Sequence, residues 1–271
     1  MNKTALLIPH YNNPEGLMLS VASIGADEKI DIFIVDDGST VKTIKENDVS
    51  AVFKAQGLVK FIYLKKNKGI EHALNAGLMD IQKTENYKYV ARLDCGDICA
   101  ENRFSTQEKF LDSNQNIMIV GSNAIAVDTN GKFLFEIIEP EQSAEIRKKM
   151  FLNCMFVHPT VMFRIDIVKL FGGYPVNRKS AEDYAFFSKV TKKYDTANIQ
   201  ESLVTIEINP DGISISKRRE QLTSRLKVIL DNFYFGFYPI YGLIRNLIIY
   251  LIPNRLIMLI KKVRDADKRH K

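Results

Sequence analysis

Cysteine is scarce in this chain. The three cysteines, Cys95, Cys99 and Cys154, are an odd number without a paired framework, and their spacing does not match a zinc site. This excludes a disulfide-stapled scaffold and favours free thiols in a reducing cytosol. The apolar part of Met1–Pro9 is too short for a signal peptide, so we expect a first strand there instead.

Long uncharged apolar runs are absent as well. The most apolar window, residues 233–252, contains Arg245, Asn246, Pro239 and two glycines. A membrane-spanning helix needs about 20 largely uncharged residues, and an arginine near its middle is costly. We therefore expect this segment to lie on a membrane surface or to pack against protein rather than to span a bilayer.

Glycine is sparse after the first apolar run. The segment Pro9–Gly16 contains one glycine, whereas dinucleotide-dependent oxidoreductases need a glycine-rich turn at this place. Sugar-nucleotide nucleotidyltransferases would need one too. Both classes are therefore disfavoured, and the chain shows no internal repeat and no low-complexity linker.

The positive charge is concentrated at one end of the 271 residues. Residues 213–271 carry 13 Lys and Arg against 4 Asp and Glu, a net charge of +9, whereas residues 1–212 have a net charge of −3. The basic residues alternate with aromatic and aliphatic ones, which suits an anionic membrane surface better than nucleic acid. We expect a catalytic domain over 1–212 and a basic helical tail over 213–271. The tail would bind a membrane surface, pack on the body or contact another subunit, which leaves a homo-oligomer open.

Strand and helix patterns alternate through the first half. The expected strands are Thr4–Pro9, Ile30–Val35, Val59–Leu64 and Tyr87–Leu93, and the expected helices are Glu15–Ile24, Val41–Ala55, Ile70–Lys83 and Glu101–Asp112. This alternation predicts an α/β fold with a Rossmann-like, mainly parallel sheet flanked by helices.

The second half has a different pattern. We expect strands at Ile117–Val120, Asn123–Val127, Lys132–Ile138, Thr160–Phe163 and Thr196–Ile208, and helices at Ala144–Leu152 and Ala181–Lys192. Asn130-Gly131 predicts a hairpin turn. From Ser216 onward a helical tail is expected, broken at Pro239 and Pro253.

Two acidic clusters stand where apolar runs end. Asp36-Asp37 follows the second expected strand, and Asp94-Cys95-Gly96-Asp97 follows the fourth. Because the carboxyl ends of parallel strands open into one crevice, these carboxylates are expected to meet around a divalent cation and a phosphate-bearing ligand. Asp94 and Asp97 are the candidate ligands of Mg²⁺ or Mn²⁺. Arg92 beside Asp94 would contact the nucleotide or form a structural ion pair.

Residues after the first three strands are candidates for nucleotide contacts. One of Asp36 and Asp37 could accept a hydrogen bond from a nucleobase N–H, while the other caps the following turn. Lys68, before a helix N-terminus, could approach a diphosphate, and an ordinary solvated lysine is the alternative. A turn that would line the base and ribose, or serve only as a turn, holds Pro9, Tyr11 and Asn12. We expect His10 in that turn to be a loop residue rather than a base.

These motifs, in this order, resemble family-two glycosyltransferases of the GT-A fold. The resemblance is carried by Pro-x-Tyr-Asn after the first strand, Val-Asp-Asp-Gly-Ser after the second, Asn-x-Gly before the third helix and Arg-Leu-Asp-x-x-Asp-Ile after the fourth strand. Further matches are Asn102-Arg103-Phe104, His158-Pro159-Thr160, Gly172-Gly173-Tyr174 and Glu182-Asp183-Tyr184, and the similarity covers roughly residues 4–190. Each motif is weak alone, whereas the series is specific.

The resemblance implies an inverting enzyme that uses a nucleotide-diphosphate sugar. It matches Asp37 to the base-binding aspartate, Asp94 to the first metal-motif aspartate and Asp183 to the general base. Glu182 would orient Asp183 or bind acceptor hydroxyls. His158 would lie near the phosphates or the acceptor, or be a satisfied core histidine. The two glycines before Tyr174 predict a mobile loop over the acceptor site.

Family members of this bacterial type extend lipid-linked or lipopolysaccharide oligosaccharides, including O-antigen, at the cytoplasmic face of the inner membrane. This implies a UDP-hexose or UDP-N-acetylhexosamine donor and a glycan or glycolipid acceptor. A dTDP-rhamnose-type transferase is the alternative donor class.

One position departs from the family pattern. Gly96 stands where the family usually has the metal-binding aspartate, so metal identity and occupancy are open. Asp97 would take over the cation, or the metal would bind weakly. A catalytically weak or inactive nucleotide- or glycan-binding relative is therefore the alternative to an enzyme.

Overall fold

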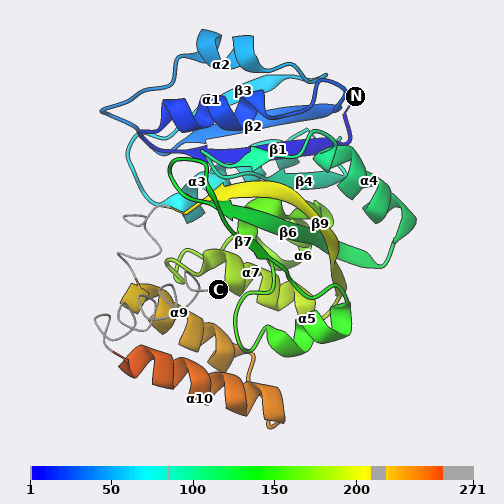
Figure 1. The fold of residues 1–271 in the computed structure, drawn as a ribbon, viewed down its shortest axis with the longest axis vertical. Helices are drawn as coiled ribbons and strands as arrows, with labels where there is room; N and C mark the ends of the chain where they lie inside the picture. The colour runs from blue at the N-terminus through cyan, green and yellow to red at the C-terminus, as the bar shows by residue number, and fades with distance from the viewer. Residues whose placement is uncertain (1, 85, 209–217, 253–271) are drawn as a thin grey trace.

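The computed structural model describes residues 2–84, 86–208 and 218–252. Within these residues, nine strands form one sheet with helices on both faces, and two further helices lie at one end (Figure 1). The longest path through the sheet has the order β3-β2-β1-β4-β8-β6-β9-β5, and β7 pairs with β6. The predicted α/β, GT-A-like class is confirmed.

The first half of the chain builds the parallel part of the sheet. Its strands are β1 (Thr4–His10), β2 (Ile30–Asp36), β3 (Val59–Tyr63) and β4 (Tyr89–Arg92), and its helices are α1 (Pro14–Ala22), α2 (Glu46–Val52) and α3 (Ile70–Gln82). Every residue of β1 and β2 is buried, as expected for central parallel strands covered on both faces. The carboxyl ends of these strands therefore open on one edge of the sheet.

The second half is mixed rather than parallel. β8 (Met162–Arg164) runs antiparallel between β4 and β6 (Ile117–Val127), and β9 (Asp195–Glu207) pairs parallel with β6. The predicted hairpin is present between β6 and β7 (Phe133–Ile137). β6 is continuous where two strands were expected, and the two-residue strand β5 (Ile98–Cys99), paired with β9, was not predicted.

The helices of the second half cover the sheet and carry part of the site. They are α4 (Arg103–Ser113), α5 (Ser143–Lys149), α6 (Asp166–Phe171) and α7 (Glu182–Thr191), with a one-turn 3₁₀ helix at His158–Thr160. The six-residue α6 was not predicted. α7 begins within one residue of the predicted helix.

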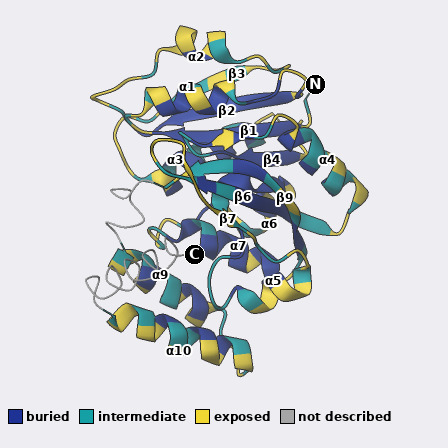
Figure 2. Ribbon diagram, in the orientation of Figure 1, coloured by how far each residue is buried: buried dark blue, intermediate teal, exposed yellow. Residues whose placement is uncertain are grey.

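Two hydrophobic layers enclose the sheet. Successive residues of β1 alternate between them: Leu7 packs in the layer with α3 and α7, and Leu6 and Ile8 pack in the layer with α1 and α4. This alternation follows from the two-residue period of a strand. Figure 2 shows the buried strands between helices whose outer faces are exposed.

The tail forms two helices on one end of the body. α9 (Arg218–Asp231) packs on α7, and α10 (Phe237–Leu251) packs on α9 (Figure 1). The tail is interrupted between Asp231 and Phe237, just before Pro239 and not at it: Pro239 occupies the first turn of α10, where a backbone N–H has no intrahelical partner to lose. Pro253, the start of the tail at Ser216 and the predicted 212/213 boundary lie outside the described residues.

α10 presents its small and polar residues to the body. Its buried residues are Pro239, Gly242 and Asn246, and Asn246 Nδ2 and Arg245 Nη1 both donate to the Leu152 carbonyl, at 3.2 and 3.0 Å. The opposite face exposes apolar side chains: Ile240, Tyr241, Ile244, Leu247, Ile248 and Leu251. Among the described residues, no helix combines the length and the hydropathy required of a membrane span.

Candidate active site

A buried histidine holds together the turns after β1 and β2. His10 Nδ1 donates to Asp36 Oδ1 at 2.7 Å, and His10 Nε2 accepts from the backbone N–H of Asn13 at 3.1 Å. Because Nε2 accepts, the proton lies on Nδ1 and both ring nitrogens are engaged. Asp36 also accepts from the Ser39 backbone N–H. The prediction of a loop residue is wrong: His10 is the last residue of β1, and its side chain joins the two turns that follow.

The neighbouring turn is organised by Asn12. Its Oδ1 accepts hydrogen bonds from three successive backbone N–H groups, at residues 40–42, with distances of 3.1 to 3.2 Å. These bonds fix residues 40–42 in the turn, and α2 begins at Glu46 and not at Val41 as predicted. Pro9 is buried in β1, whereas Tyr11 is 48% exposed at the edge of the turn.

Asp37 fixes the turn that leads into α3. Its Oδ1 accepts from the Lys68 backbone N–H at 2.9 Å, and its Oδ2 accepts from the Gly69 N–H at 2.8 Å. The carboxylate is 4% exposed, so a nucleobase N–H would have to share an oxygen that already accepts a hydrogen bond. The Lys68 side chain is exposed beside the N-terminus of α3, the end of a helix that favours phosphate.

Arg92 lies behind the site and not in it. The side chain is fully buried; Nη1 donates to the Leu7 carbonyl at 2.7 Å, Nη2 bonds Asp94 Oδ1, and Nε donates to His158 Nε2 at 3.3 Å. A side chain without exposed surface cannot touch a ligand, so the predicted contact of Arg92 with nucleotide is not supported. The structural ion pair, the other interpretation of the sequence, is what the structure contains. Arg92 sets the positions of Asp94 and His158.

His158 is held neutral next to this guanidinium. Burial, followed by the Arg92 charge, lowers the pKa of His158 to about 4. The charges of Asp183 and Asp94 act in the opposite direction, so both carboxylates lie within electrostatic range of the imidazole. The Tyr174 hydroxyl lies 3.1 Å from Nε2. A neutral imidazole therefore lies within electrostatic range of both carboxylates, Asp94 after β4 and Asp183 in α7.

The two acids at the start of α7 have different environments. Glu182 is 6% exposed, and within the described part of the chain its Oε2 has no hydrogen-bond partner. Burial, then the Asp183 charge, raises the pKa of Glu182, with weaker contributions from Glu71 and Asp94. Asp183 is half-buried, and its Oδ1 accepts from the Tyr184 backbone N–H. Glu182 is therefore suited to donate a hydrogen bond, and Asp183 Oδ2 to accept one.

The first turn of α3 connects the nucleotide side of the site to these acids. Glu71 is 5% exposed and lies beside Gly69: a Cβ added to Gly69 would be 2.7 Å from Glu71 Oε2. Glu71 also contributes to the raised pKa of Glu182. Asp37, through Gly69 and Glu71, thus belongs to the same region as Asp94 and Asp183.

Tyr174 is part of the core and not of a mobile flap, so that expectation is wrong. It is 2% exposed, and its ring lies 4.8 Å from that of Phe186, centroid to centroid. Asn75 clamps its backbone, because Asn75 Nδ2 donates to the Tyr174 carbonyl and the Tyr174 N–H donates to Asn75 Oδ1, both at 2.8 Å. The double glycine before Tyr174 permits close packing, since a Cβ on Gly173 would lie 2.1 Å from Asn75 Oδ1.

The donors present suit a metal only in part. Asp94 is half-exposed and has one oxygen free of the Arg92 pair. Asp97 is buried and accepts from the Glu207 backbone N–H, and burial, followed by the Asp94 charge, raises its pKa. The geometry therefore argues against Asp97 as a ligand. Within the described ranges, no group of three His, Cys, Asp or Glu could hold an ion. Mg²⁺ commonly takes one or two carboxylates together with substrate phosphates, an arrangement that Asp94 fits.

Sequence reasoning missed Arg225. It projects from α9 in the predicted tail, and burial lowers its pKa while the charges of Tyr184, Cys154 and Asp183 oppose that shift. The tail therefore brings a cation within electrostatic range of Asp183. No motif marks this residue, because only the packing of α9 on α7 brings it there.

Comparison with known proteins identifies the family. Residues 5–171 match the family model described as Glycosyl transferase family 2. The chain is 30% identical over 240 residues to the bifunctional glycosyltransferase pgtA of Dictyostelium discoideum, covering 76% of this chain and 31% of that protein. It is 29% identical over 258 residues to the amylovoran biosynthesis glycosyltransferase AmsE of Erwinia amylovora, covering 90% of this chain and 92% of that protein.

The relatives differ in length: the chain spans about a third of the length of the first curated relatives it matches. Among solved structures, S. aureus TarS 1–349 in complex with UDP superposes with a TM-score of 0.66 at 19% identity, covering 91% of this chain and 71% of that one. TarS has also been solved with UDP-GlcNAc. The fold is therefore shared, and the family model covers more than half of the sequence. The chain belongs to glycosyl transferase family 2.

Proposed function

We propose that this protein is an inverting glycosyltransferase that moves a hexosyl or N-acetylhexosaminyl group from a UDP-sugar to a hydroxyl of a lipid-linked or lipopolysaccharide oligosaccharide. One observation carries the proposal. Asp183, whose Oδ2 accepts no hydrogen bond within the described residues, and the strand-end carboxylate Asp94 both lie within electrostatic range of the same neutral imidazole, His158. A hydrogen-bond acceptor beside a strand-end crevice is what a single displacement at an anomeric carbon requires.

The reaction proceeds in one step. Asp183 Oδ2 takes the proton of the acceptor hydroxyl while that oxygen forms its bond to the anomeric carbon. The bond from the anomeric carbon to the diphosphate oxygen breaks at the same time, and the nucleoside diphosphate leaves with the electron pair. Attack opposite the leaving group inverts the anomeric configuration. Glu182 holds its own proton, because burial raises its pKa, and therefore binds an acceptor oxygen as a donor.

The nucleotide would lie over the ends of β1 and β2. Tyr11 and Lys68 offer exposed side chains there, and Asn12 and Asp37 hold the two turns in place. Lys68 and the N-terminus of α3 favour the diphosphate. The UDP and UDP-GlcNAc complexes of TarS support a uracil donor.

A divalent cation, Mg²⁺ or Mn²⁺, would be held by Asp94 and the donor's phosphates. Bound there, it would supply positive charge to the leaving diphosphate. Asp94 is kept in place by Arg92.

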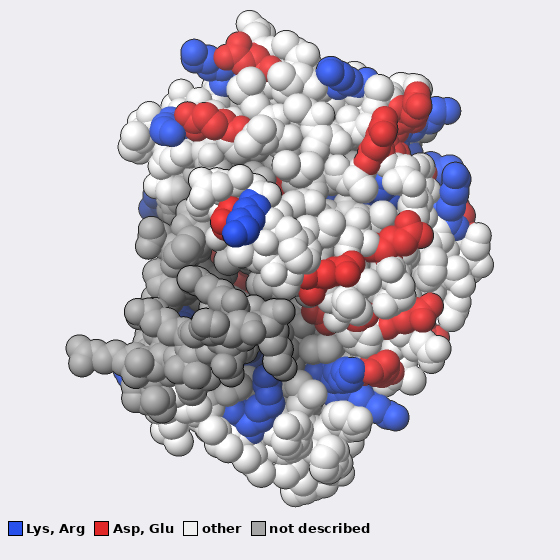
Figure 3. Space-filling model, in the orientation of Figure 1, with Lys and Arg blue, Asp and Glu red and all other residues white. Residues whose placement is uncertain are grey.

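We also infer that the protein is peripheral on the cytoplasmic face of a membrane. The support is the exposed apolar face of α10, a helix whose one charged residue, Arg245, is hydrogen-bonded to the body. Figure 3 shows α10 as an almost uncharged surface at the bottom of the molecule, below Lys and Arg side chains around α5. AmsE, named for polysaccharide biosynthesis, supports a glycan acceptor of this kind.

A donor panel tests the proposal. Nucleoside diphosphate release and thermal unfolding would be measured with UDP-hexoses, UDP-N-acetylhexosamines, GDP-mannose and dTDP-rhamnose, with and without Mn²⁺. A UDP-sugar at a hundredfold excess over its Kd should add about 2.7 kcal/mol to the free energy of unfolding and should turn over. Stronger turnover of dTDP-rhamnose than of any UDP-sugar would show that the donor is a dTDP-sugar. Binding of donors without any turnover would indicate a non-catalytic relative.

A further inference from the structure

A cavity of about 400 Å³ lies between α5, α7 and the end of α9. Its size is within the roughly 300–1,000 Å³ of ligand sites. Its walls are largely apolar, formed by Met150, Phe151, Tyr184, Val228 and Ile229. None of the carboxylates of the candidate active site lines it, so it is a separate site.

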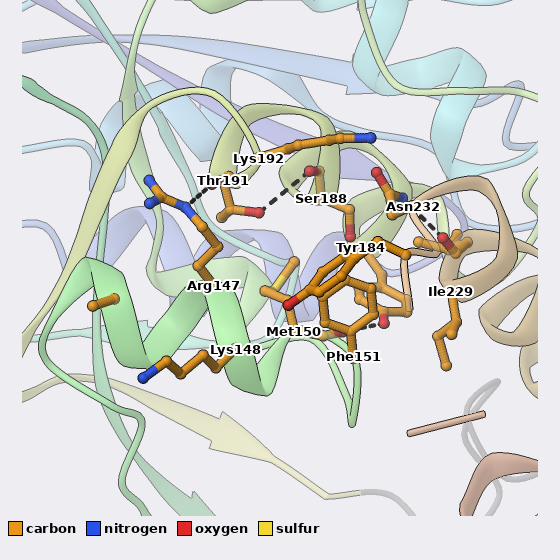
Figure 4. Close-up of a pocket in the computed structure, with 13 residues that line it drawn as sticks. Arg147, Lys148, Met150, Phe151, Tyr184, Ser188, Thr191, Lys192, Ile229 and Asn232 are labelled. Atoms are coloured by element: carbon orange, nitrogen blue, oxygen red, sulfur yellow. Dashed lines mark hydrogen bonds between the residues drawn. The ribbon is translucent and has the colours of Figure 1, made fainter. Parts of the chain in front are cut away.

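Three cations and no carboxylate line this cavity. The Arg147 guanidinium already binds groups of the protein: it donates to the Thr191 carbonyl at 2.7 Å and pairs with Asp195 at 3.3 Å. Lys148 and Lys192 are exposed, and among residues 2–84, 86–208 and 218–252 neither pairs with an acidic side chain. Figure 4 shows Arg147 and Lys148 on one side of the Tyr184 and Phe151 rings and Lys192 above these rings. An apolar cavity with free cations at its edge is complementary to an anion that carries a hydrocarbon chain.

The cavity lies next to the candidate active site along α7. Tyr184, which lines the cavity, directly follows Asp183, and Lys192 follows the last residue of the helix. With a rise of 1.5 Å per residue, Lys192 lies about 13 Å along the helix axis from Asp183. On the facing helix, Arg225 precedes Val228 and Ile229 by one turn and lies within electrostatic range of Asp183.

We propose that this cavity binds a long-chain lipid phosphate, with the hydrocarbon among the side chains of α5, α7 and α9 and the phosphate between Lys148 and Lys192. The site is distinct from the candidate active site, and the inference does not depend on the proposed function.

The absence of tryptophan from the chain provides a direct reporter. Phe151→Trp places a single indole in the wall of the cavity, since the sequence contains no other tryptophan. Dodecyl phosphate, dodecyl maltoside and inorganic phosphate would be titrated below their micelle concentrations. The same titrations would be run with Lys148→Glu and Lys192→Glu combined in that background. Lys189→Glu is the matched control, an exposed lysine of α7 that does not line the cavity.

We expect a saturable blue shift with dodecyl phosphate, a Kd raised at least tenfold by the double charge reversal, and no change with Lys189→Glu. Inorganic phosphate alone should give no shift, and dodecyl maltoside a weaker one. No saturable response to dodecyl phosphate, equal affinity of the double variant and the control, or an equal response to inorganic phosphate would each overturn the inference. Donor turnover measured on the same preparations separates the two proposals: a lost lipid response with normal donor turnover overturns the cavity's role alone.

Discussion

The two neighbouring acids of α7 differ in what they can do, because one is buried and the other is not. Glu182 keeps its proton in an enclosed position, with one oxygen unpartnered within the described structure. The sequence alone does not distinguish Glu182 from Asp183 as the general base, and only the family resemblance selects Asp183. Burial gives a physical reason for the same choice.

Glu182→Gln should therefore change little. An uncharged amide of the same shape replaces a carboxyl group that already holds a proton, so kcat for donor turnover should stay within about fivefold of the wild type. Steady-state kinetics at pH 7 would measure it. A loss of a hundredfold or more would mean that Glu182 acts as a charged group.

His158 gives the stability of the protein a specific pH dependence. Its folded-state pKa of about 4 lies below the ordinary value of 6.5, so the unfolded chain takes up the proton first as pH falls. The stability from neutral His158 is complete above about pH 6.5 and is lost towards pH 4, by up to about 3 kcal/mol.

Urea unfolding of the wild type and of His158→Gln across pH 4–8 tests this. The difference in unfolding free energy between the two proteins should shrink below pH 6.5, since the glutamine does not titrate. Parallel stability curves would contradict the assignment.

The local elements were largely predictable because their patterns are local. Short apolar runs, separated by helical segments, predicted β1, β2 and β3. Helical periodicity predicted α3 and α7. The failures involve tertiary contacts: Asn12 holds residues 40–42 in a turn ahead of the shorter α2, and β5 exists only through its pairing with β9. The same limit applies to the site, where carboxylates at strand ends could be predicted but Arg225 and the Asn75 clamp could not.

The turn into α3 depends on one glycine. Gly69 has φ = 107°, a conformation that L-residues rarely adopt, and a Cβ there would lie 2.7 Å from Glu71 Oε2. Gly69→Ala should therefore lower the unfolding free energy by about 1–3 kcal/mol and weaken donor binding, because the Gly69 N–H bonds Asp37.

Gly172→Ala is the matched control for backbone strain alone. Gly172 also has a positive φ, of 76°, but nothing lies within 4 Å of a Cβ added there. Chemical denaturation should show a smaller loss for this variant and unchanged donor affinity. Equal losses in both variants would show that the contact with Glu71 is irrelevant.

At the scale of the whole molecule, the tail is part of the working protein. Sequence charge separated residues 213–271 from the body, yet α9 packs on α7 and α10 is hydrogen-bonded to Leu152. The outward apolar face of α10 could not be foreseen from its hydrophobic pattern, which does not tell which side faces the body.

This face predicts membrane binding that is separable from folding. Ile244 and Ile248 are 51% and 55% exposed, so replacing both with Glu should leave Tm unchanged. Burial of such side chains contributes about 1.5–3 kcal/mol each, so cosedimentation with vesicles containing phosphatidylglycerol should fall more than tenfold. Leu230→Glu, at an equally exposed leucine of α9, is the control. Undiminished sedimentation of the double variant would exclude α10 as the contact.

The central claim is that Asp183 removes a proton from the acceptor during sugar transfer, and Asp183→Asn tests it most directly. Donor affinity, measured by calorimetry, should stay within about twofold of the wild type, while kcat should fall by about 10²–10⁴-fold, the usual contribution of a general base. Turnover by Asp183→Asn at the wild-type rate, with the donor bound normally, would contradict the account.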